Sequence, residues 1–346
     1  MTTEGEESSR MDHEKFMLRA LALAARGYPA PNPHVGCVIA HGNLSVGEGW
    51  HKYAGAPHAE AVALLQAGDA ARGATAYVTL EPCAHTGRTP PCADALIASG
   101  IAAVFVSVRD PNPVAAGGAE KLRAAGIQVE IGLLEALGIA VNQQFLFAIQ
   151  HKRPMVTLKA GVSLDARIAL GSGESQWITN EKSRLEGHRL RAQCGAVLVG
   201  RRTVELDDPE LTARFRGVRN QPLRVVLDPH AKLTGTERVF NDKAETFHIT
   251  GNIVLAELCD HLYKNGVKGL LVEGGAITHS SFVRAGLADK LELFIGAKLI
   301  GKGPTWLDDF GLDKLSWAPK WKIDRTRTLG SDLQLSAHFL KGQTEP

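Results

Sequence analysis

Hydrophobic residues recur along the chain with two periods, one typical of helices and one typical of strands, and the two kinds of segment alternate. Apolar positions such as Met17, Leu21 and Ala24 predict an amphipathic helix between Met11 and Arg26. Short apolar runs rich in Val, Ile and Ala then alternate with Ala/Leu-rich segments at helical spacing. The predicted strands are 35–40, 44–50, 76–80 and 101–108, the predicted helices are 57–67 and 92–99, and a further helix and strand end near 131.

A second series of the same kind starts after the polar stretch from His151 to Pro154, which follows a helix predicted over 133–150. Its predicted strands are 155–161, 196–200, 224–228, 246–250, 269–272 and 291–295, and its predicted helices are near 181–192, 254–265 and 278–285. Because strands and helices alternate in both series, both are predicted to be α/β domains. We therefore expect a disordered tail over residues 1–10, one domain over 11–150 and a second over 151–346.

Composition and charge narrow the classes of partner. With 44% hydrophobic and 22% charged residues among 346, the chain has the composition of an ordinary globular protein. Its 39 Lys and Arg against 37 Asp and Glu leave a net charge of +2, which gives no support for a nucleic-acid or membrane partner. A small molecule that carries a phosphate needs only a local cluster of cations, so it stays a candidate substrate.

Cysteine usage and the lengths of the apolar runs bear on the compartment. The five cysteines are scattered and odd in number, which favours a reducing compartment over a disulfide framework. No apolar run has the length of a membrane span, and the polar N-terminus has no hydrophobic region of a secretory signal. We therefore expect a cytoplasmic protein, for which homo-oligomerisation stays open.

Three residues with metal-ligand chemistry stand at the ends of predicted elements. His58 lies at the start of a predicted helix, Cys83 follows a predicted strand, and Cys92 opens the next helix. One imidazole and two thiolates can hold a single Zn²⁺ and leave its fourth position for water, which is the catalytic pattern. Glu60, two residues after His58, can then move the proton of that water. This H-x-E…P-C…C pattern is the signature of zinc-dependent nucleobase deaminases.

Other interpretations of these residues stay open. His85, two residues after Cys83, can compete as a ligand. The cysteines can instead be buried core thiols, with His58 capping its helix. With four protein ligands the zinc would be structural, and the second domain would be a nucleotide-binding regulator rather than an enzyme.

The second domain carries residues suited to phosphate binding and proton transfer. It lacks the G-x-G-x-x-G fingerprint, so a Rossmann dinucleotide domain is not predicted. Gly274 and Gly275 lie between a predicted strand and a predicted helix, where backbone N–H groups can approach a phosphate. Arg191 and Arg214 can grip a phosphate bidentately, and Lys159 can assist proton transfer as a hydride reaches a sugar carbon.

Longer motifs resemble a known family. The run TLEPCAHTGRTPPC at 79–92, PNPHVGC at 31–37 and DPNP at 110–113 resemble the deaminase half of the bifunctional riboflavin-biosynthesis deaminase/reductase family. The eight residues between Cys83 and Cys92 depart from the C-x-x-C of other deaminases but are usual in that family. The runs at 159–167, 173–179, 190–193 and 207–214 resemble its reductase half.

The resemblance implies a fold and an activity. A cytidine-deaminase-like three-layer domain would be followed by a dihydrofolate-reductase-like α/β domain. The first would deaminate 2,5-diamino-6-ribosylamino-4(3H)-pyrimidinone 5′-phosphate with one Zn²⁺ per chain. The second would use NADPH to reduce the ribosyl group to ribityl.

The resemblance also implies roles for individual residues, with Glu60 and Lys159 as catalytic residues. Substrate contacts in the deaminase half would come from Asn32, His51, Arg88, Asp110 and Asn112. Substrate contacts in the reductase half would come from Ser175, Arg191, Leu211, Arg214 and Glu273. The cofactor would contact Gly161, Trp177, Thr203, Asp207, Gly275, Ala276, Ile277, Thr278, His279, Ser280 and Ser281.

The chain departs from the family pattern at a few positions. Ala166 stands where the family commonly has Gly, and Arg201 and Arg202 replace small residues near the expected cofactor turn. NADPH rather than NADH requires a cation at the 2′-phosphate, and several arginines can serve. The alternative function is a zinc deaminase of another nucleobase or of tRNA with an appended nucleotide-binding domain, against which the near-neutral charge and the cysteine spacing argue.

Overall fold

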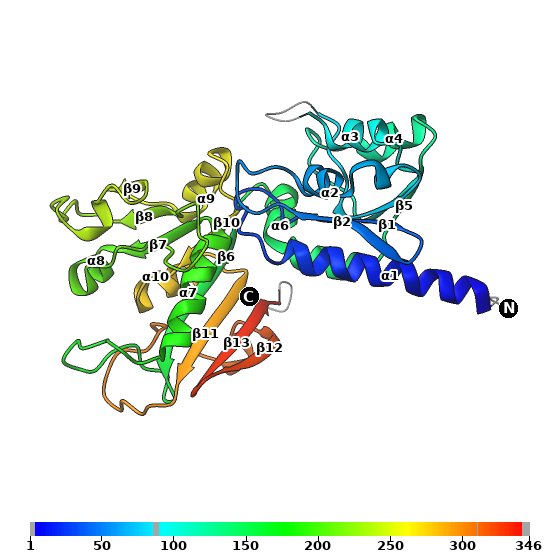
Figure 1. Cartoon of the computed structure of the whole chain (residues 1–346). Helices are drawn as coiled ribbons and strands as arrows, with labels where there is room; N and C mark the ends of the chain where they lie inside the picture. The colour runs from blue at the N-terminus through cyan, green and yellow to red at the C-terminus, as the bar shows by residue number, and fades with distance from the viewer. Residues whose placement is uncertain (1–3, 86–89, 310, 341–346) are drawn as a thin grey trace. The chain divides into compact units, whose positions relative to one another are not determined.

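The computed structural model describes residues 4–85, 90–309 and 311–340, and the chain divides into two compact units, residues 1–150 and 151–346 (Figure 1). Each unit is built around its own sheet, of five strands in the first unit and eight in the second. Among the described residues, no helix has both the length and the apolar character needed to cross a bilayer.

The first unit has a mixed five-stranded sheet in the order β2-β1-β3-β4-β5. Strand β1 runs antiparallel to β2 and β3, whereas β3, β4 and β5 are parallel. In chain order the elements are α1 (Glu4–Ala24), β1 (Gly36–His41), β2 (Leu44–Trp50), α2 (Ala59–Ala67), a 3₁₀ turn (Gly68–Ala71), β3 (Thr75–Leu80), α3 (Cys92–Ala98), β4 (Ala103–Val108), α4 (Gly118–Ala124), β5 (Gln128–Ile131), α5 (Glu135–Val141) and α6 (Gln143–His151).

Helices cover both faces of this sheet, because successive strand residues point to opposite faces. On β1, Cys37 and Ile39 pack with residues of α2 and α3 in one apolar cluster. Val38 and Ala40 pack with residues of α1 in a second cluster on the other face. The three-layer arrangement expected of this unit is therefore confirmed.

Two helix predictions for this unit need correction. Helix α1 begins at Glu4, so residues 4–10 are helical rather than part of a disordered tail, while residues 1–3 lie outside the described residues. The helix predicted over 133–150 is two helices separated at Asn142. The Asn142 side chain accepts a hydrogen bond from His34 N (2.8 Å) and donates one to His34 O (2.9 Å). An asparagine that bonds to distant backbone favours such a break.

The second unit has an eight-stranded sheet in the order β12-β13-β11-β6-β10-β7-β8-β9. Its strands are parallel except β13, which runs antiparallel to β11 and to β12. The elements are β6 (Met155–Ser163), α7 (Glu181–Cys194), β7 (Ala196–Gly200), α8 (Arg201–Asp207), β8 (Leu223–Leu227), a 3₁₀ turn (Arg238–Phe240), β9 (Thr246–Ile249), α9 (Leu255–Lys264), β10 (Gly269–Val272), α10 (Ala276–Arg284), β11 (Lys290–Gly296), a 3₁₀ turn (Leu315–Trp317), β12 (Trp321–Leu329) and β13 (Asp332–Phe339).

The sequence analysis did not predict α8 or the hairpin β12–β13. Most residues of β12 are exposed and polar, so the strand lacks the apolar run on which strand prediction depends. Backbone pairing with β13 holds β12 in the sheet instead. In the rest of the sheet, β6, β10, β7 and β8 end side by side, and such carboxyl ends of parallel strands commonly border ligand sites.

Candidate active sites

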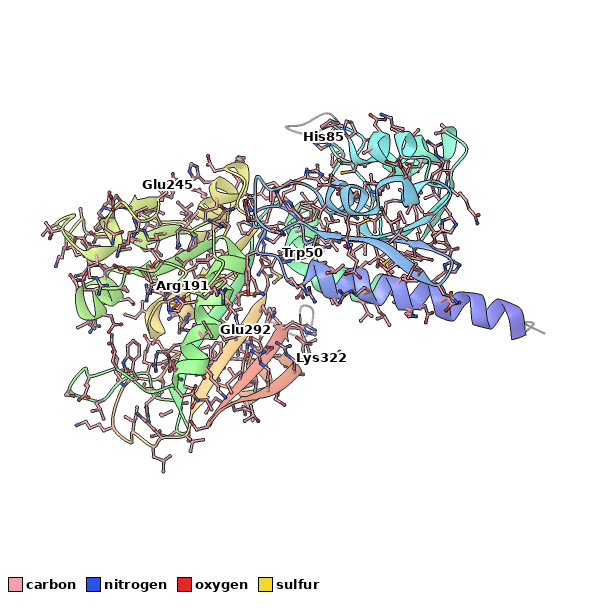
Figure 2. All side chains as sticks on the ribbon, viewed as in Figure 1. Trp50, His85, Arg191, Glu245, Glu292 and Lys322 are labelled. Carbon is pink, nitrogen blue, oxygen red and sulfur yellow. The ribbon has the colours of Figure 1, made fainter. Side chains whose placement is uncertain are left out.

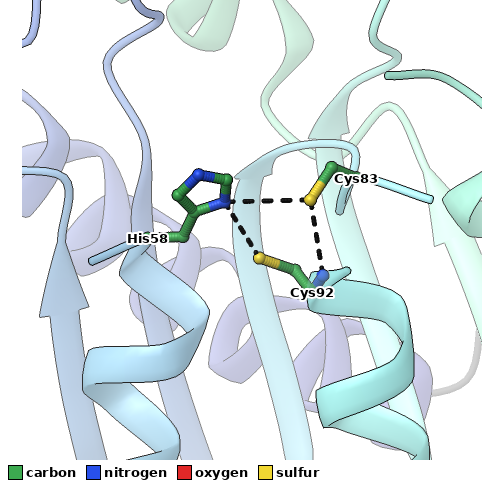
Figure 3. A group of neighbouring side chains, drawn as sticks. All are labelled: His58, Cys83 and Cys92. Carbon is green, nitrogen blue, oxygen red and sulfur yellow. Dashed lines mark hydrogen bonds between the residues drawn. The ribbon is translucent and has the colours of Figure 1, made fainter. Parts of the chain in front are cut away.

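The first candidate site is a cluster of His58, Cys83 and Cys92 (Figure 3). His58 immediately precedes α2, Cys83 follows β3, and Cys92 is the first residue of α3. His58 Nδ1 lies 3.2 Å from Cys92 Sγ and 3.7 Å from Cys83 Sγ. The ligand atoms of all three side chains lie within 4.8 Å of one another, although the residues are distant in sequence.

Proton positions in this cluster suit a bound cation. The hydrogen bonds from the Cys92 and His58 side chains lower the pKa of the Cys83 thiol to about 4. The same contact with Cys83 raises the pKa of Cys92 and also that of His58. The backbone N–H of Cys92 also donates to Cys83 Sγ at 3.3 Å. One thiolate is thus already favoured, and a divalent cation would replace the remaining thiol proton.

Glu60 lies on the first turn of α2 with only 3% of its surface exposed. Burial raises the pKa of its carboxyl group. Its Oε2 atom has no hydrogen-bond partner among the described residues, which is rare for a buried carboxylate and indicates a place for a ligand or water. One imidazole, two thiols and this unpartnered carboxylate fit a catalytic zinc ion. His85 is exposed and is not part of the cluster found among the described residues, so the geometry does not support it as a ligand.

His51 and Asn32 meet beside this cluster. The His51 ring lies 5.6 Å from the His58 ring, centre to centre. His51 Nδ1 donates to Pro57 O at 3.1 Å, so its Nε2 accepts from the Asn32 side-chain amide at 3.1 Å. Burial lowers the pKa of His51 and keeps the ring neutral. The two predicted substrate residues are therefore held together with fixed donor and acceptor roles.

Asp110 and Asn112 form a turn after β4. The backbone N–H of Asn112 donates to Asp110 Oδ1 at 2.9 Å, and the Asn112 side chain accepts from Val114 N at 3.3 Å. Burial raises the pKa of Asp110 to about 6. The remaining predicted substrate residue of this unit, Arg88, lies outside the described residues.

Glu81, to which the sequence analysis gave no role, organises this turn. Its carboxylate accepts hydrogen bonds from the backbone N–H groups of Asp110 (3.2 Å), Gly117 (3.2 Å) and Ala119 (3.0 Å). It is 4% exposed. In the sequence, the only indication of this role is an acidic residue at the end of an apolar strand. Its three partners come from a different part of the chain, so the sequence pattern does not reveal them.

The second candidate site is a cleft of ≈ 1320 Å³ in the second unit. Its lining contains seven Lys and Arg side chains against four Asp and Glu, so the cleft is positive although the chain is nearly neutral. The predicted site residues that line it are Lys159, Gly161, Ser175, Trp177, Arg191, Thr203, Asp207, Leu211, Arg214, Glu273, Gly275, Ala276, Ile277, Thr278 and Ser281.

The structure does not bring His279 and Ser280 to this cleft. Both lie on the buried face of α10, with 1% and 0% of their surface exposed. His279 contacts the carbonyl oxygens of Val272 and Trp306 at 3.1 and 3.0 Å, and Ser280 Oγ accepts from Asp308 N at 2.8 Å. The helical period turns these two side chains away from the face that their neighbours share.

Glu273 lines the cleft and lies between two cations. Arg191, which comes from α7 (Figure 2), donates to both carboxylate oxygens of Glu273 at 2.6 and 3.0 Å, and Lys159 Nζ lies 3.3 Å away. Burial disfavours the charge of Glu273, but Arg191 and Lys159 hold its pKa below its usual value. A third bond joins Arg191 to Thr212 O at 3.0 Å. Arg191 therefore orients Glu273 and Lys159, whereas the sequence analysis paired it with Arg214 as a phosphate clamp.

Further contacts link the predicted substrate and cofactor residues. Ser175 donates to Asp207 at 2.9 Å. The Arg184 guanidinium lies 4.4 Å from the Trp177 ring centre, and Trp177 is 59% exposed. The sequence analysis missed His188, which lines the cleft and donates from Nδ1 to Thr212 O at 3.1 Å. Burial and the neighbouring Arg191 and Arg214 lower the pKa of His188 to about 4.

The turns after β7 and β10 approach each other closely at this cleft. A Cβ atom on Gly200 would lie 2.8 Å from Thr278 Oγ1, and one on Gly274 would lie 2.6 Å from Thr278 Cβ. A Cβ on Gly275 would meet nothing within 4 Å. Gly200 and Gly274 thus permit the packing of the turns, while Gly275 leaves its backbone open to a ligand.

Two family models match this chain, one in each unit. The model for the RibD C-terminal domain matches residues 154–335. The model for the cytidine and deoxycytidylate deaminase zinc-binding region matches residues 10–108. The predicted fold class, a cytidine-deaminase-like domain followed by a reductase domain, is thereby confirmed, and the reductase family points to a nucleotide cofactor.

Curated relatives match this chain over most of its length. The riboflavin biosynthesis protein RibD of Aquifex aeolicus (strain VF5) is 42% identical over 344 residues, which cover 92% of this chain and 96% of that protein. RibD of Escherichia coli (strain K12) is 41% identical over 362 residues, covering 94% and 99%.

Solved structures agree with these relatives. Acinetobacter baumannii RibD (form 1) matches with a TM-score of 0.90 and 37% identity, covering 96% of this chain and 100% of that chain. The diaminohydroxyphosphoribosylaminopyrimidine deaminase/5-amino-6-(5-phosphoribosylamino)uracil reductase of Thermotoga maritima matches with a TM-score of 0.88 and 37% identity over the same shares. These matches confirm the resemblance drawn from the motifs and set aside the alternatives of a tRNA deaminase and a non-enzymatic regulator. The chain belongs to the RibD family of riboflavin biosynthesis proteins and is a bifunctional enzyme with a zinc-binding deaminase domain and a reductase domain.

Proposed function

We propose that the chain catalyses two reactions on one pyrimidine ribosyl phosphate. The first unit hydrolyses the 2-amino group of 2,5-diamino-6-ribosylamino-4(3H)-pyrimidinone 5′-phosphate. The second unit reduces the ribosyl group of the product to ribityl with NADPH. The observation that carries the proposal is the pairing of an unpartnered Glu60 beside a His-Cys-Cys cluster in one unit with a positive cleft around Lys159 and Glu273 in the other.

In the deaminase reaction, His58, Cys83 and Cys92 would hold one Zn²⁺. An ion held by these residues would lower the pKa of water and so supply a nucleophile at neutral pH. Glu60 takes the proton of the attacking water and delivers it to the leaving amino group, so that C2 gains an oxygen and ammonia departs. The raised pKa of Glu60 suits a group that must hold this proton and then release it.

Substrate contacts in this unit are proposed for the residues around the cluster. His51 and Asn32, joined by the hydrogen bond from the Asn32 amide to His51 Nε2, are the proposed contacts for the pyrimidine edge. Asp110 and Asn112 approach from the turn that Glu81 holds. For Arg88 the proposal rests on its cation alone, which suits the 5′-phosphate.

In the reductase reaction, a reduced nicotinamide nucleotide bound in the cleft would supply a hydride to C1′ of the sugar, where the C1′–O4′ bond of the ribose ring breaks. Lys159 Nζ is the proposed donor of the proton that O4′ gains, and Glu273 holds Lys159 in position at 3.3 Å. Arg214, with a side chain 53% exposed, is the proposed contact for the substrate phosphate. We place the cofactor along Gly161, Trp177, Thr203, Asp207 and the turn from Gly275 to Ser281, of which His279 and Ser280 serve only to anchor α10.

The proposal also covers the number of zinc ions, the partners and the cellular location of the enzyme. One zinc ion per chain follows from the single His-Cys-Cys cluster among the described residues. Both ligands of the proposed reactions are small molecules, so neither nucleic acid nor a membrane is required. A cytoplasmic location accords with the free cysteines.

An absorbance assay of the zinc-loaded protein with the diaminopyrimidinone ribosyl phosphate tests the proposal. We expect ammonia release without NADPH, followed by NADPH oxidation when NADPH is added. Ammonia release without subsequent oxidation would confine the activity to the first unit. Folded, zinc-bound protein that gives neither signal would overturn the assignment of the substrate.

A further inference from the structure

The cleft of the second unit extends along the carboxyl ends of four adjacent strands. At one end lie Lys159 of β6 and Glu273, which follows β10, and these are the groups proposed to act on the sugar. At the other end the lining is formed by Arg202 after β7 and by His230 after β8. A dinucleotide whose nicotinamide lies near Lys159 and whose phosphates lie at the turn after β10 then places its adenosine half near β7 and β8.

The acidic group at the β8 end is buried and lies beside a cation. Asp228, which follows β8, is fully buried. Its Oδ2 accepts hydrogen bonds from Leu233 N at 2.9 Å and from His248 Nε2 at 3.2 Å, and Arg201 Nε lies 3.7 Å from its Oδ1. An exposed carboxylate at the end of such a strand commonly binds the 2′-hydroxyl of NAD and repels a 2′-phosphate. Here the carboxylate is turned inward, so Asp228 does not select against a 2′-phosphate.

The two arginines after β7 differ in their contacts. Arg201 is engaged by Glu205 on the next turn of α8 and by Asp228. Arg202 is exposed, lines the cleft, and has no ion pair or hydrogen bond with any described residue. Arg238 also lines this end but shares Glu210 with Arg214 and Lys243. Arg202 is therefore the cation left available to a ligand among the described residues at this end.

We propose that Arg202 binds the 2′-phosphate of the adenosine ribose and makes the reductase selective for NADPH over NADH. This inference rests on the proposed reductase function and adds the residue that discriminates between the two cofactors. A guanidinium suits the task because its fork of N–H groups matches phosphate oxygens bidentately.

Binding of adenosine fragments to the full chain tests this proposal without turnover. We would measure the affinities of 2′,5′-ADP and 5′-AMP by calorimetry for the parent and for Arg202→Gln, Arg202→Lys and Arg219→Gln. Arg219 is exposed and lies outside the cleft lining, so it controls for loss of one positive charge. We expect Arg202→Gln to weaken 2′,5′-ADP by roughly 10- to 100-fold and to leave 5′-AMP unchanged. Arg202→Lys should lose less affinity for 2′,5′-ADP, and Arg219→Gln should lose none.

Steady-state kinetics complete the test. The ratio of kcat/KM for NADPH to that for NADH should fall in Arg202→Gln by the same factor, through a higher KM for NADPH. A parent protein that binds 5′-AMP and 2′,5′-ADP equally and prefers NADH would overturn NADPH use itself. A parent that prefers 2′,5′-ADP together with an Arg202→Gln variant that keeps this preference would overturn only the assignment of Arg202.

Discussion

Glu60 combines burial with an unpartnered carboxylate oxygen, and this predicts a role in chemistry rather than in stability. Glu60→Gln removes the proton carrier but keeps the shape of the side chain. We expect deaminase kcat to fall by roughly 10²- to 10⁴-fold, because general acid–base catalysis contributes about that much. Zinc content and reduction of pre-deaminated substrate should stay at parental values. Ammonia release at the parental rate would refute the assignment, and Glu130→Gln, at an exposed position on β5, is the matched control.

His188 predicts a pH dependence of stability. Its pKa is lowered from its ordinary value of 6.5 to about 4, mainly by burial. Below pH 6.5 the unfolded chain gains a proton that the folded chain does not take up until about pH 4. The stability that neutral His188 contributes is therefore complete above pH 6.5 and is lost as the pH falls toward 4.

The variant His188→Asn separates this contribution from other groups, since its amide can still donate to Thr212 O but does not titrate. Urea denaturation at pH 7 and pH 5 should show a smaller loss of unfolding free energy in the variant than in the parent. His261→Asn, at an exposed position on α9, should behave like the parent. Equal losses in the parent and in His188→Asn would contradict the prediction.

At the scale of elements, Glu81 joins the end of β3 to the start of α4. Its carboxylate accepts three backbone N–H groups of the segment from Asp110 to Ala119. A Cβ atom on Gly118 would lie 1.7 Å from Pro82 O, so the two segments are also in close backbone contact. The turn that carries Asp110 and Asn112 is therefore fixed by a residue outside it.

Glu81→Gln places an amide N–H among these donors and should lower the free energy of unfolding by about 1–3 kcal/mol. Because the turn then shifts, the deaminase KM should rise more than kcat falls, while reductase kinetics stay unchanged. Urea denaturation and initial rates measure the two effects, and Glu135→Gln, exposed at the start of α5, is the control. Destabilisation with an unchanged deaminase KM would show that Glu81 serves stability alone.

At the scale of the whole molecule, the two units have separate cores and separate chemistry. The apolar clusters of residues 1–150 and of residues 151–346 share no member, and each candidate site is built within one unit. Metal binding should therefore affect only the deaminase activity and only the stability of the first unit.

Removal of zinc by a chelator tests this independence. Deaminase activity should disappear and the first unit should melt at a lower temperature, since a metal that binds only the folded state stabilises it. The reductase rate with pre-deaminated substrate should not change. Calorimetry and the two assays, with zinc restored as the control, measure these effects. A parallel loss of reductase activity would contradict the independence of the units.

What the sequence determined by itself is local or carried by motifs. Strands 44–50, 196–200 and 269–272 were predicted with the bounds that the structure has, because each is a short run flanked by glycine or polar residues. The metal ligands were also predicted from the sequence, since His58, Cys83 and Cys92 keep a characteristic spacing and stand at the ends of elements. The helix over residues 4–10 and the break at Asn142 were not predicted, because polar residues do not produce the apolar periodicity from which helices are predicted.

The tertiary structure decided which partners each side chain has. Only folding brings Glu81 to the segment that begins at Asp110, turns His279 into the core, and joins Arg191 to Glu273. The same holds for Arg201 and Arg202, which are neighbours in the chain but differ because only Arg201 reaches Asp228. Hydrogen bonds and ion pairs depend on distances of a few ångströms between residues far apart in sequence, and a linear pattern does not contain those distances.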